Sequence, residues 1–187
     1  MKKIPTMFQR RPVQRHVTDT VTSGCEWVLV GEGVATRKWD GSCCMVRGNK
    51  LYKRRELSGG QEAPPLFEQV GIDSATGKRV GWVPVGDSPE DRWHREAFMR
   101  AADWPDGTYE LVGPKVNGDN DGVGGHKLIP HGTVKHPIED RSIHGIRRAL
   151  ESMPWEGFVF WHPDGRRAKI KRKDFNLPWP VAQEVKP

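Results

Sequence analysis

The sequence has few cysteines and no long apolar run, and each absence excludes a class of protein. Three of the 187 residues are cysteine, two of them adjacent, and no CxxC pair occurs. A disulfide framework or a cysteine-rich zinc site is therefore not expected. No apolar run approaches the roughly 18–20 residues that a membrane span needs, and the first residues lack the apolar stretch of a signal peptide. We expect a protein that spans no membrane and works in the cytoplasm, or in the host cytoplasm if it is viral.

Several common ligand-binding motifs are missing as well. The sequence contains neither a GxxxxGK[ST] phosphate loop nor a GxGxxG stretch that follows a strand and opens a helix. Asn117–Gly122 imitates the start of an EF-hand loop, but its twelfth position would be Leu128, where a bidentate glutamate is required. His126, His131 and His136 are five residues apart, which is not the spacing of one helix face. We therefore expect structural or solvent-exposed histidines rather than metal ligands.

The residues that are plentiful point to a globular protein with a polyanionic partner. Eight tryptophans and six phenylalanines supply large side chains for a core, although charged residues make up 29% of the chain. The formal net charge is +6 and the isoelectric point is about 9.4. A basic domain of this size favours nucleic acid as a partner, while a merely soluble basic surface is the alternative.

Turn residues and helix-start signals predict many short strands and two helices. One helix should begin at Ser88, with a proline at its first position and acids in its first turn, and end near Asp103. A second should cover about Glu139–Ser152. The expected strands are Trp27–Val30, Gly33–Lys38, Ser42–Arg47, Leu51–Arg55, Val70–Ile72, Arg79–Val85, Thr108–Gly113, Glu156–Trp161 and Arg167–Arg172. This pattern predicts an α+β domain with antiparallel strands.

The segment Lys38-Trp39-Asp40-Gly41 contains a candidate nucleophile. Covalent catalysis by lysine needs a neutral amine, whereas an unperturbed lysine with a pKa of about 10.4 is charged at neutral pH. Burial and neighbouring cations lower that value, and the chain offers many cations. Taken alone, the segment also fits a surface lysine before a turn.

Two further segments place charges on strands. In Lys53-Arg54-Arg55, strand alternation puts Lys53 and Arg55 on one face and Arg54 on the other, so one face can reach a nucleotide while the other meets solvent or RNA. Glu110 is flanked by apolar strand residues, and a carboxylate there must be paired or hydrogen-bonded. A ribose hydroxyl and a structural salt bridge both fit that requirement.

The last two segments combine an acid with a basic strand. Glu156 precedes Gly157 at the start of an apolar strand, where it can help to hold a metal while the glycine lets a ligand approach closely. Alternation places Lys169, Lys171 and Lys173 on one face. Paired ammonium groups suit an α-phosphate that gains charge as pyrophosphate leaves. Alone, the basic strand fits a solvent-facing surface equally well.

The five segments, in this order, closely resemble the motifs of the covalent nucleotidyltransferases, the superfamily of DNA and RNA ligases and capping enzymes. The resemblance covers residues 38–171. It implies an antiparallel-sheet nucleotidyltransferase (adenylyltransferase) domain of the ATP-grasp-like ligase type. We expect one such domain over residues 1–187, with a motif core at 25–175 and a basic N-terminal segment at 1–24. Since 16 residues follow Lys171, we expect no OB domain.

The resemblance also implies a role for each matching residue. Lys38 would attack the α-phosphate, Glu156 would support a divalent metal, and Lys169 and Lys171 would contact the α-phosphate. The expected nucleotide-binding residues are Arg37, Asp40, Gly41, Arg55, Glu110 and Val159. The expected RNA-binding residues are Lys53, Arg54 and Lys173. Independently of the resemblance, we expect Arg147 and Arg172 at the surface, where their substitution should leave adenylylation near normal and affect only RNA binding.

Finer features are similar to the small group related to the vertebrate 5′–3′ RNA ligase. They are Lys38–Cys44, Tyr109–Gly118, Leu128–Gly132 and Gly81–Val85, whereas Arg37 departs from the acid that this group tends to carry. The resemblance implies an ATP-dependent RNA ligase that joins RNA 3′-hydroxyl and 5′-phosphate ends with ATP and Mg²⁺ or Mn²⁺, and we expect a monomer. The alternatives are a minimal DNA ligase, a guanylyltransferase, or a basic RNA-binding module with an inactive nucleotidyltransferase fold. The nucleophile would be Lys38, which would become lysyl-AMP.

Overall fold

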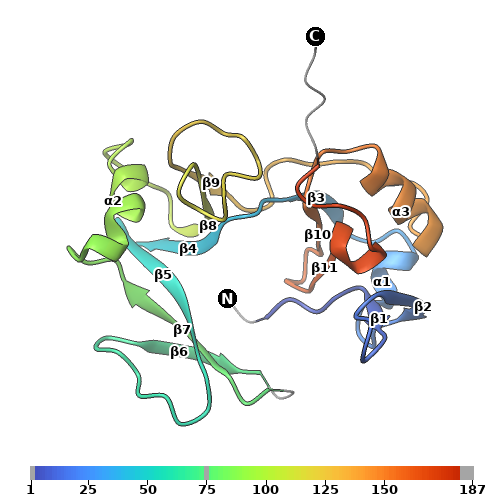
Figure 1. The fold of residues 1–187 in the computed structure, drawn as a ribbon, viewed down its shortest axis with the longest axis horizontal. Helices are drawn as coiled ribbons and strands as arrows, with labels where there is room; N and C mark the ends of the chain where they lie inside the picture. The colour runs from blue at the N-terminus through green and yellow to red at the C-terminus, as the bar shows by residue number, and fades with distance from the viewer. Residues whose placement is uncertain (1–2, 74–75, 182–187) are drawn as a thin grey trace. The chain divides into compact units, whose positions relative to one another are not determined.

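The computed structural model describes residues 3–73 and 76–181 (Figure 1). The described chain forms two compact units, and the expectation of a single nucleotidyltransferase domain over residues 1–187 stays a prediction. The six-stranded unit contains Asp40–His131, and the three-stranded unit contains Ile4–Trp39 together with residues 132–181. Each unit has its own cluster of buried apolar residues. The apolar pattern along a chain does not reveal how many cores it forms, so the sequence did not show this division.

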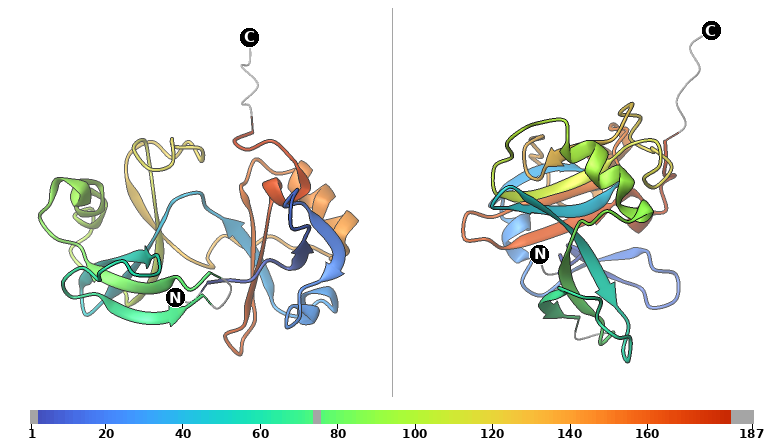
Figure 2. Two further views of the ribbon diagram at one scale, coloured as in Figure 1. Left: turned by 60° about the horizontal axis from the view of Figure 1, so that its bottom comes forward. Right: turned by 90° about the vertical axis from the view of Figure 1, so that its left-hand side faces the viewer.

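The six-stranded unit is built around one antiparallel sheet with the strand order β6-β7-β5-β4-β8-β9. Consecutive strands pair as two antiparallel hairpins, β4 with β5 and β6 with β7. The strand β5 pairs with β4 on one side and with β7 on the other (Figure 2). The strand β9 is not among the strands that the sequence predicts, and it is only four residues long. The strands are β4 (Ser42–Arg47), β5 (Lys50–Leu57), β6 (Glu68–Ile72), β7 (Arg79–Pro84), β8 (Gly107–Val112) and β9 (Lys127–Pro130).

The helix that begins near Ser88 is shorter than predicted. Pro89–Asp91 form the 3-10 turn η1, and α2 spans Arg92–Phe98, so the helix does not reach Asp103. The indole N–H of Trp104 donates to the carbonyl of the last helical residue at 2.8 Å. A donor at that carbonyl stabilises the helix end there, and only the folded chain brings Trp104 to it.

The three-stranded unit contains a sheet with the order β11-β10-β3 and three short helical segments. The predicted strands β3, β10 and β11 are confirmed as antiparallel partners. A separate hairpin of β1 and β2 lies in the segment that the sequence marks only as basic. The elements are β1 (Phe8–Arg10), β2 (Val17–Val21), α1 (Glu26–Leu29), β3 (Val34–Lys38), α3 (Ile143–Glu151), β10 (Gly157–Trp161), β11 (Arg167–Lys171) and η2 (Arg172–Phe175).

Two helices of this unit differ from the sequence predictions. The predicted strand Trp27–Val30 is wrong, because these residues form most of α1. A run of four apolar residues fits either a buried strand or one helical turn, and burial of the Trp27 side chain fixed the helix here. The helix α3 begins later than Glu139, after Ser142, whose hydroxyl accepts a hydrogen bond from the Gly145 N–H at 3.1 Å.

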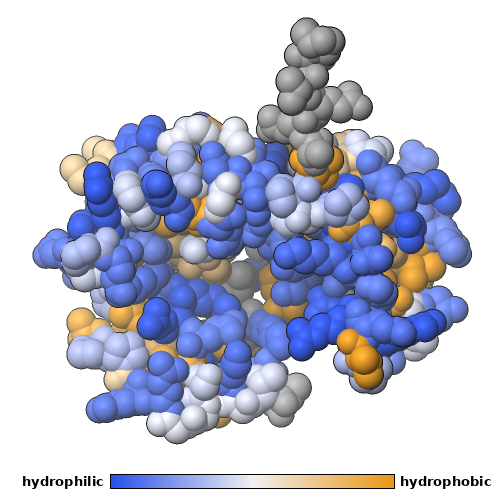
Figure 3. All heavy atoms as spheres, viewed as in Figure 1, coloured by the Kyte–Doolittle hydropathy of each residue, from blue (hydrophilic) through white to orange (hydrophobic). Residues whose placement is uncertain are grey.

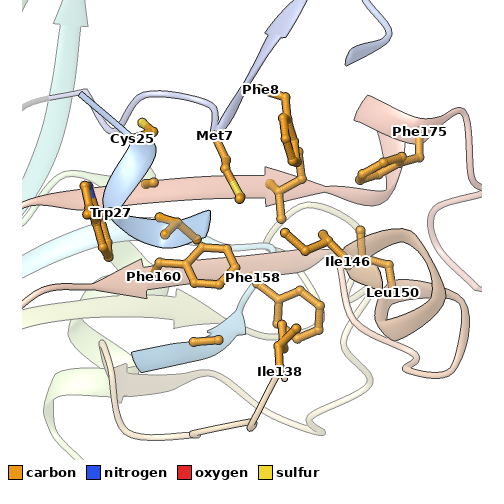
Figure 4. Close-up of a cluster of buried hydrophobic side chains, with 14 residues drawn as sticks. Met7, Phe8, Cys25, Trp27, Ile138, Ile146, Leu150, Phe158, Phe160 and Phe175 are labelled. Atoms are coloured by element: carbon orange, nitrogen blue, oxygen red, sulfur yellow. The ribbon is translucent and has the colours of Figure 1, made fainter. Parts of the chain in front are cut away.

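The core of the three-stranded unit lies on one face of its sheet. Alternation sends Phe158, Phe160 and Ile170 to that face, where they meet Ile146 and Leu150 of α3 (Figure 4). All five side chains are fully buried. Burying each one contributes about 1.5–3 kcal/mol, so this packing is what holds β10 and β11 in place.

The end of β11 corrects two expectations about the basic residues that follow it. Because β11 ends at Lys171, Lys173 belongs to η2 and does not continue the strand face. Arg172 is 4% exposed, and its guanidinium donates to the carbonyls of Met153 at 2.9 Å and Pro178 at 2.8 Å. Arg172 therefore links two backbone segments through hydrogen bonds. The expectation that Arg172 lies at the surface is wrong. Arg147, by contrast, is exposed.

The molecular surface is polar, in keeping with a mean hydropathy of −0.70. On the face in Figure 3, hydrophilic residues predominate and hydrophobic residues form small separate patches. Among the described residues, none of the helices has both the length and the apolar character that crossing a bilayer requires.

Candidate active site

Lys38 lies at the end of β3, beside the first residue of the central strand β10. The register pairs Lys38 with Gly157, and it pairs Lys171 of β11 with the same glycine from the other side. Directly opposed residues of neighbouring strands point to the same face of a sheet. The two lysines therefore flank Gly157 on the face opposite the apolar core.

Glu156 joins these two lysines through its carboxylate. Its Oε2 accepts a hydrogen bond from Lys38 Nζ, and its Oε1 accepts one from Lys171 Nζ at 2.5 Å. The glutamate is only 4% exposed, so its charge is held by the two ammonium groups rather than by bulk water. Lys38 Nζ also donates to the carbonyl of Trp39 at 3.0 Å.

The position of Glu156 resolves a conflict in the sequence pattern. Strict alternation would place Glu156 and Val159 on opposite faces if both were strand residues. The strand β10 begins at Gly157, so the glutamate precedes it and no bulge is needed. A Cβ at Gly157 would lie 2.1 Å from the carbonyl oxygen of Ile170. Only glycine therefore permits this close approach of β10 to β11.

Lys169 is a third lysine on the same sheet face. It lies opposite Val159, two residues before Lys171. The pKa of Lys169 is lowered to about 8, chiefly by burial, with further lowering by Lys171, Lys38 and Arg10 and an opposing contribution from Glu156. Its backbone is held on the outer side of β11, where the Met7 N–H donates to its carbonyl at 2.8 Å. Three positive charges thus gather around one carboxylate.

We expect Lys169→Met to stabilise the protein at pH 7. The native pKa of about 8 lies below the ordinary 10.5, so charging Lys169 opposes folding fully below pH 8. That penalty disappears as the pH rises toward 10.5. In chains of this size, each kcal/mol of unfolding free energy shifts the melting temperature by a few degrees. The melting temperature of the variant should therefore exceed that of the wild type by roughly 5 °C at pH 7.

Thermal denaturation at pH 7 and at pH 10 checks this expectation, with the exposed Lys135→Met as the matched control. The gap between Lys169→Met and the wild type should shrink at the higher pH, and Lys135→Met should show little gap at either. If the difference in melting temperature between Lys169→Met and the wild type were the same at pH 7 and pH 10, the charge of Lys169 would not be what destabilises the wild type.

Arg37 and Val159 have different positions relative to Lys38. Val159 is 9% exposed and lies on the lysine face, opposite Thr36. Arg37 pairs with Phe158 and so points to the other face, where its guanidinium carbon lies 3.6 Å from the centre of the Trp39 ring. The structure therefore brings Val159, but not Arg37, to the lysine face. The role of each in nucleotide binding stays a prediction.

In the six-stranded unit, a loop holds the carboxylate of Asp40. The side-chain amides of Asn117 and Asn120 donate to its two oxygens at 3.1 and 2.8 Å. The Asp40 N–H donates to Asp121 at 2.8 Å. This loop contains Asn117–Gly122, the segment that imitates the start of an EF-hand loop. Its contacts with Asp40 hold the backbone of the lysine motif in place. The sequence signal was the cluster of amides and glycines, but nothing local linked it to Asp40.

Glu110 lies on β8, next to the glycine of the same motif. Its Oε1 accepts a hydrogen bond from the Gly41 N–H at 3.2 Å, and its Oε2 lies 2.7 Å from Nε2 of His131. A Cβ at Gly41 would lie 2.1 Å from the carbonyl oxygen of Leu111, so this position requires glycine. The partner His131 was considered structural by sequence, and the structure places it against a predicted site residue.

The basic strand β5 supplies charges of two kinds. Lys53 is occupied by Glu90 and Asp91, at 2.7 and 2.6 Å, and its side chain is 15% exposed. Arg54 forms an ion pair with Glu56 at 2.7 Å. Arg55 is exposed and lines a depression of about 380 Å³. The Arg55 side chain is therefore accessible to a ligand, whereas the Lys53 ammonium group is already paired with two carboxylates. RNA binding by β5 stays a prediction.

The predicted site residues thus divide between the two units. Lys38, Glu156, Lys169 and Lys171 belong to the three-stranded unit, and Asp40 and Glu110 belong to the six-stranded unit. The chain passes from one unit to the other within the lysine motif, after Trp39.

Comparison with known proteins identifies distant relatives. No protein-family model matches the chain. A protein named RNA ligase 1 from Danio rerio is 36% identical over 90 residues, which cover 43% of this chain and 28% of that protein. A protein named RNA ligase 1 from Rattus norvegicus is 23% identical over 252 residues, which cover 92% of this chain and 76% of that protein. The chain is a distant relative of these two proteins named RNA ligase 1. Its match spans less than a third of the zebrafish protein.

Proposed function

We propose that this protein is an ATP-dependent RNA ligase of the covalent nucleotidyltransferase type, in which Lys38 carries AMP. The observation that carries the proposal is the cluster of Lys38, Glu156 and Lys171 on one sheet face, in a chain related to proteins named RNA ligase 1. A merely basic surface would not need a buried carboxylate between two lysines.

In the proposed first step, the neutral amine of Lys38 attacks the α-phosphorus of ATP. A nitrogen–phosphorus bond forms, the bond to the β-phosphate oxygen breaks, and pyrophosphate leaves. The ammonium must first lose a proton, and Glu156, in contact with Nζ, is placed to accept it. Lys169 and Lys171 share the face of Lys38 and would stabilise the charge on the α-phosphate.

The carboxylate of Glu156 fits the divalent ion that such a reaction implies. Magnesium and manganese prefer oxygen ligands and are commonly bound by one or two carboxylates together with substrate phosphates. Glu156 is held in place by Lys38 and Lys171, and either oxygen could serve such an ion. When bound, the ion would neutralise phosphate charge.

The remaining steps would transfer AMP to an RNA 5′-phosphate and then join that end to a 3′-hydroxyl with release of AMP. Glu110 would bind the ribose of ATP, as the buried acid at Gly41. The exposed Arg55 would contribute to nucleotide binding, and the exposed Lys173 would attract the RNA backbone. The relatives' name favours RNA over DNA as substrate.

We expect sealing to require a ribose at the 3′-hydroxyl end. A terminal 2′-hydroxyl offers a hydrogen bond that helps to align the attacking oxygen. Loss of that bond should slow sealing by roughly tenfold or more. The test compares two pre-adenylylated nicked substrates that differ only in the sugar of the 3′-terminal nucleotide, which bypasses the Lys38 step.

The outcomes of this comparison separate the proposed function from its alternatives. Equal sealing of an all-DNA substrate would replace RNA ligation with minimal DNA ligation. Incubation of the protein with labelled ATP or GTP would identify a guanylyltransferase by its nucleotide. RNA binding without adenylylation or sealing would show an inactive RNA-binding module.

A further inference from the structure

A second cluster of reactive side chains lies in the six-stranded unit, on three neighbouring strands. Cys43 of β4 pairs directly with Glu110 of β8, and His131 follows β9, which is the next strand of the sheet. The His131 N–H donates to the carbonyl of Thr108 at 3.0 Å and so continues the pairing of β9 with β8. One face of a rigid sheet therefore presents a thiol, a carboxylate and an imidazole together.

The distances within this cluster suit a small metal ion. One ligand atom from each of the three side chains lies within 4.8 Å of the other two, and His131 Nε2 is 2.7 Å from Glu110 Oε2. Ligand bonds of about 2.0–2.3 Å in a tetrahedral zinc site place the ligand atoms roughly 3.5 Å apart. Side-chain movements of about an ångström would therefore bring the three ligand atoms to the spacing that a tetrahedral ion requires.

The chemistry of the three ligands selects the kind of metal. Thiolate and imidazole favour zinc and related soft or borderline ions, whereas magnesium requires oxygen ligands. The side chains of Glu110 and His131 are 11% and 15% exposed, so the cluster is largely shielded from water. The three groups leave one tetrahedral position for water or another small ligand.

We propose that Cys43, Glu110 and His131 form a zinc site that inhibits adenylylation. This inference rests on the proposed function, which gives the carboxylate of Glu110 to the ribose of ATP. An ion held by Cys43 and His131 would take that carboxylate, and Gly41, whose N–H contacts Glu110, would lose this partner. Zinc and nucleotide then compete for one acid, so zinc holds the enzyme inactive until it is removed.

The direct test is titration of the full-length, metal-free protein with Co²⁺, which replaces zinc and reports thiolate ligation by a charge-transfer band. We expect one Co²⁺ per chain with this band, and its loss when Zn²⁺ displaces the cobalt. Cys43→Ser should remove the band and weaken Zn²⁺ binding by at least the roughly 10- to 100-fold that even an outer-shell partner contributes. His131→Gln is the second variant, with the same expected loss of affinity.

The matched control is Cys44→Ala. Cys44 adjoins Cys43 in sequence but is fully buried in the core on the other sheet face, so cobalt binding should persist in this variant. Far-ultraviolet circular dichroism of every variant shows whether it is folded. A band that is absent from the wild type, or that survives in Cys43→Ser, would overturn the proposed site.

The functional part is tested by measuring AMP transfer from ATP with excess Mg²⁺, with and without Zn²⁺. Zinc should block transfer in the wild type and much less in Cys43→Ser. Equal inhibition of the two would overturn the regulatory role, because zinc would then act at another site. If the metal-free wild type transfers no AMP even with Mg²⁺, the proposed function fails, whereas the cobalt titration still decides whether the metal site exists.

Discussion

Replacing Lys38 by alanine should abolish transfer of AMP from ATP to the protein, with a loss of at least about a thousandfold. The amine of Lys38, at the end of β3 and in contact with Glu156, is the proposed attacking group, and alanine lacks it. Lys38→Arg should be equally inactive, since a guanidinium stays protonated and is a poor nucleophile. Intact-protein mass spectrometry after incubation with ATP and Mg²⁺ measures the added AMP.

The matched control is Lys135→Ala, which replaces an exposed lysine of the same unit. This variant should accept AMP as the wild type does. Peptide mapping of the wild-type adduct provides the decisive comparison. An adduct on any residue other than Lys38 would remove the basis of the proposed mechanism.

Replacing Glu156 by glutamine should reduce adenylylation by roughly 10²- to 10³-fold, although the side chain keeps its shape. The substitution leaves the ammonium groups of Lys38 and Lys171 facing each other without the charge that now separates them. Lys38 loses both its orienting partner and the proposed proton acceptor. Initial rates of AMP transfer at saturating ATP, measured with rising Mg²⁺, check this expectation.

The control for Glu156→Gln is Glu151→Gln, an exposed carboxylate of the same unit that pairs with Arg147 at the surface. It should retain the wild-type rate, because a surface pair contributes little. Removing one partner of a buried charge cluster also destabilises a protein, by about 3–5 kcal/mol in typical cases. Melting curves of Glu156→Gln must therefore accompany the rates. A folded variant with an unchanged rate would exclude Glu156 from the reaction.

Sequence patterns predicted the strands best where a turn or an alternation was unambiguous. The hairpins β4–β5 and β10–β11 follow glycine- or aspartate-containing turns that bring consecutive strands together. The patterns failed for short elements. The one-turn helix α1 was predicted as a strand, and the four-residue strand β9 was missed, because so few residues carry no clear period.

The sequence predicted which residues form the candidate site, but it did not predict which of them contact one another. The order of motifs identified Lys38, Glu156 and Lys171 from chemistry and resemblance. It could not show that one carboxylate bridges the two lysines across a strand, since that contact joins residues 118 positions apart. Arg172 was predicted to lie at the surface for the same reason. Its partners are carbonyls that only the folded chain brings near.

The sequence by itself determined the basic charge, the antiparallel α+β character and the identity of the lysine, acid and glycine residues, because composition and short-range spacing control these properties. The tertiary structure alone decided which of them meet. It set the register that places Lys38 and Lys171 on either side of Gly157. It also divided the chain into two units and brought Cys43, Glu110 and His131 onto one face. The physical reason is that strand pairing and burial bring together residues that are far apart in the chain. The sequence around one residue does not specify which distant residue it will contact.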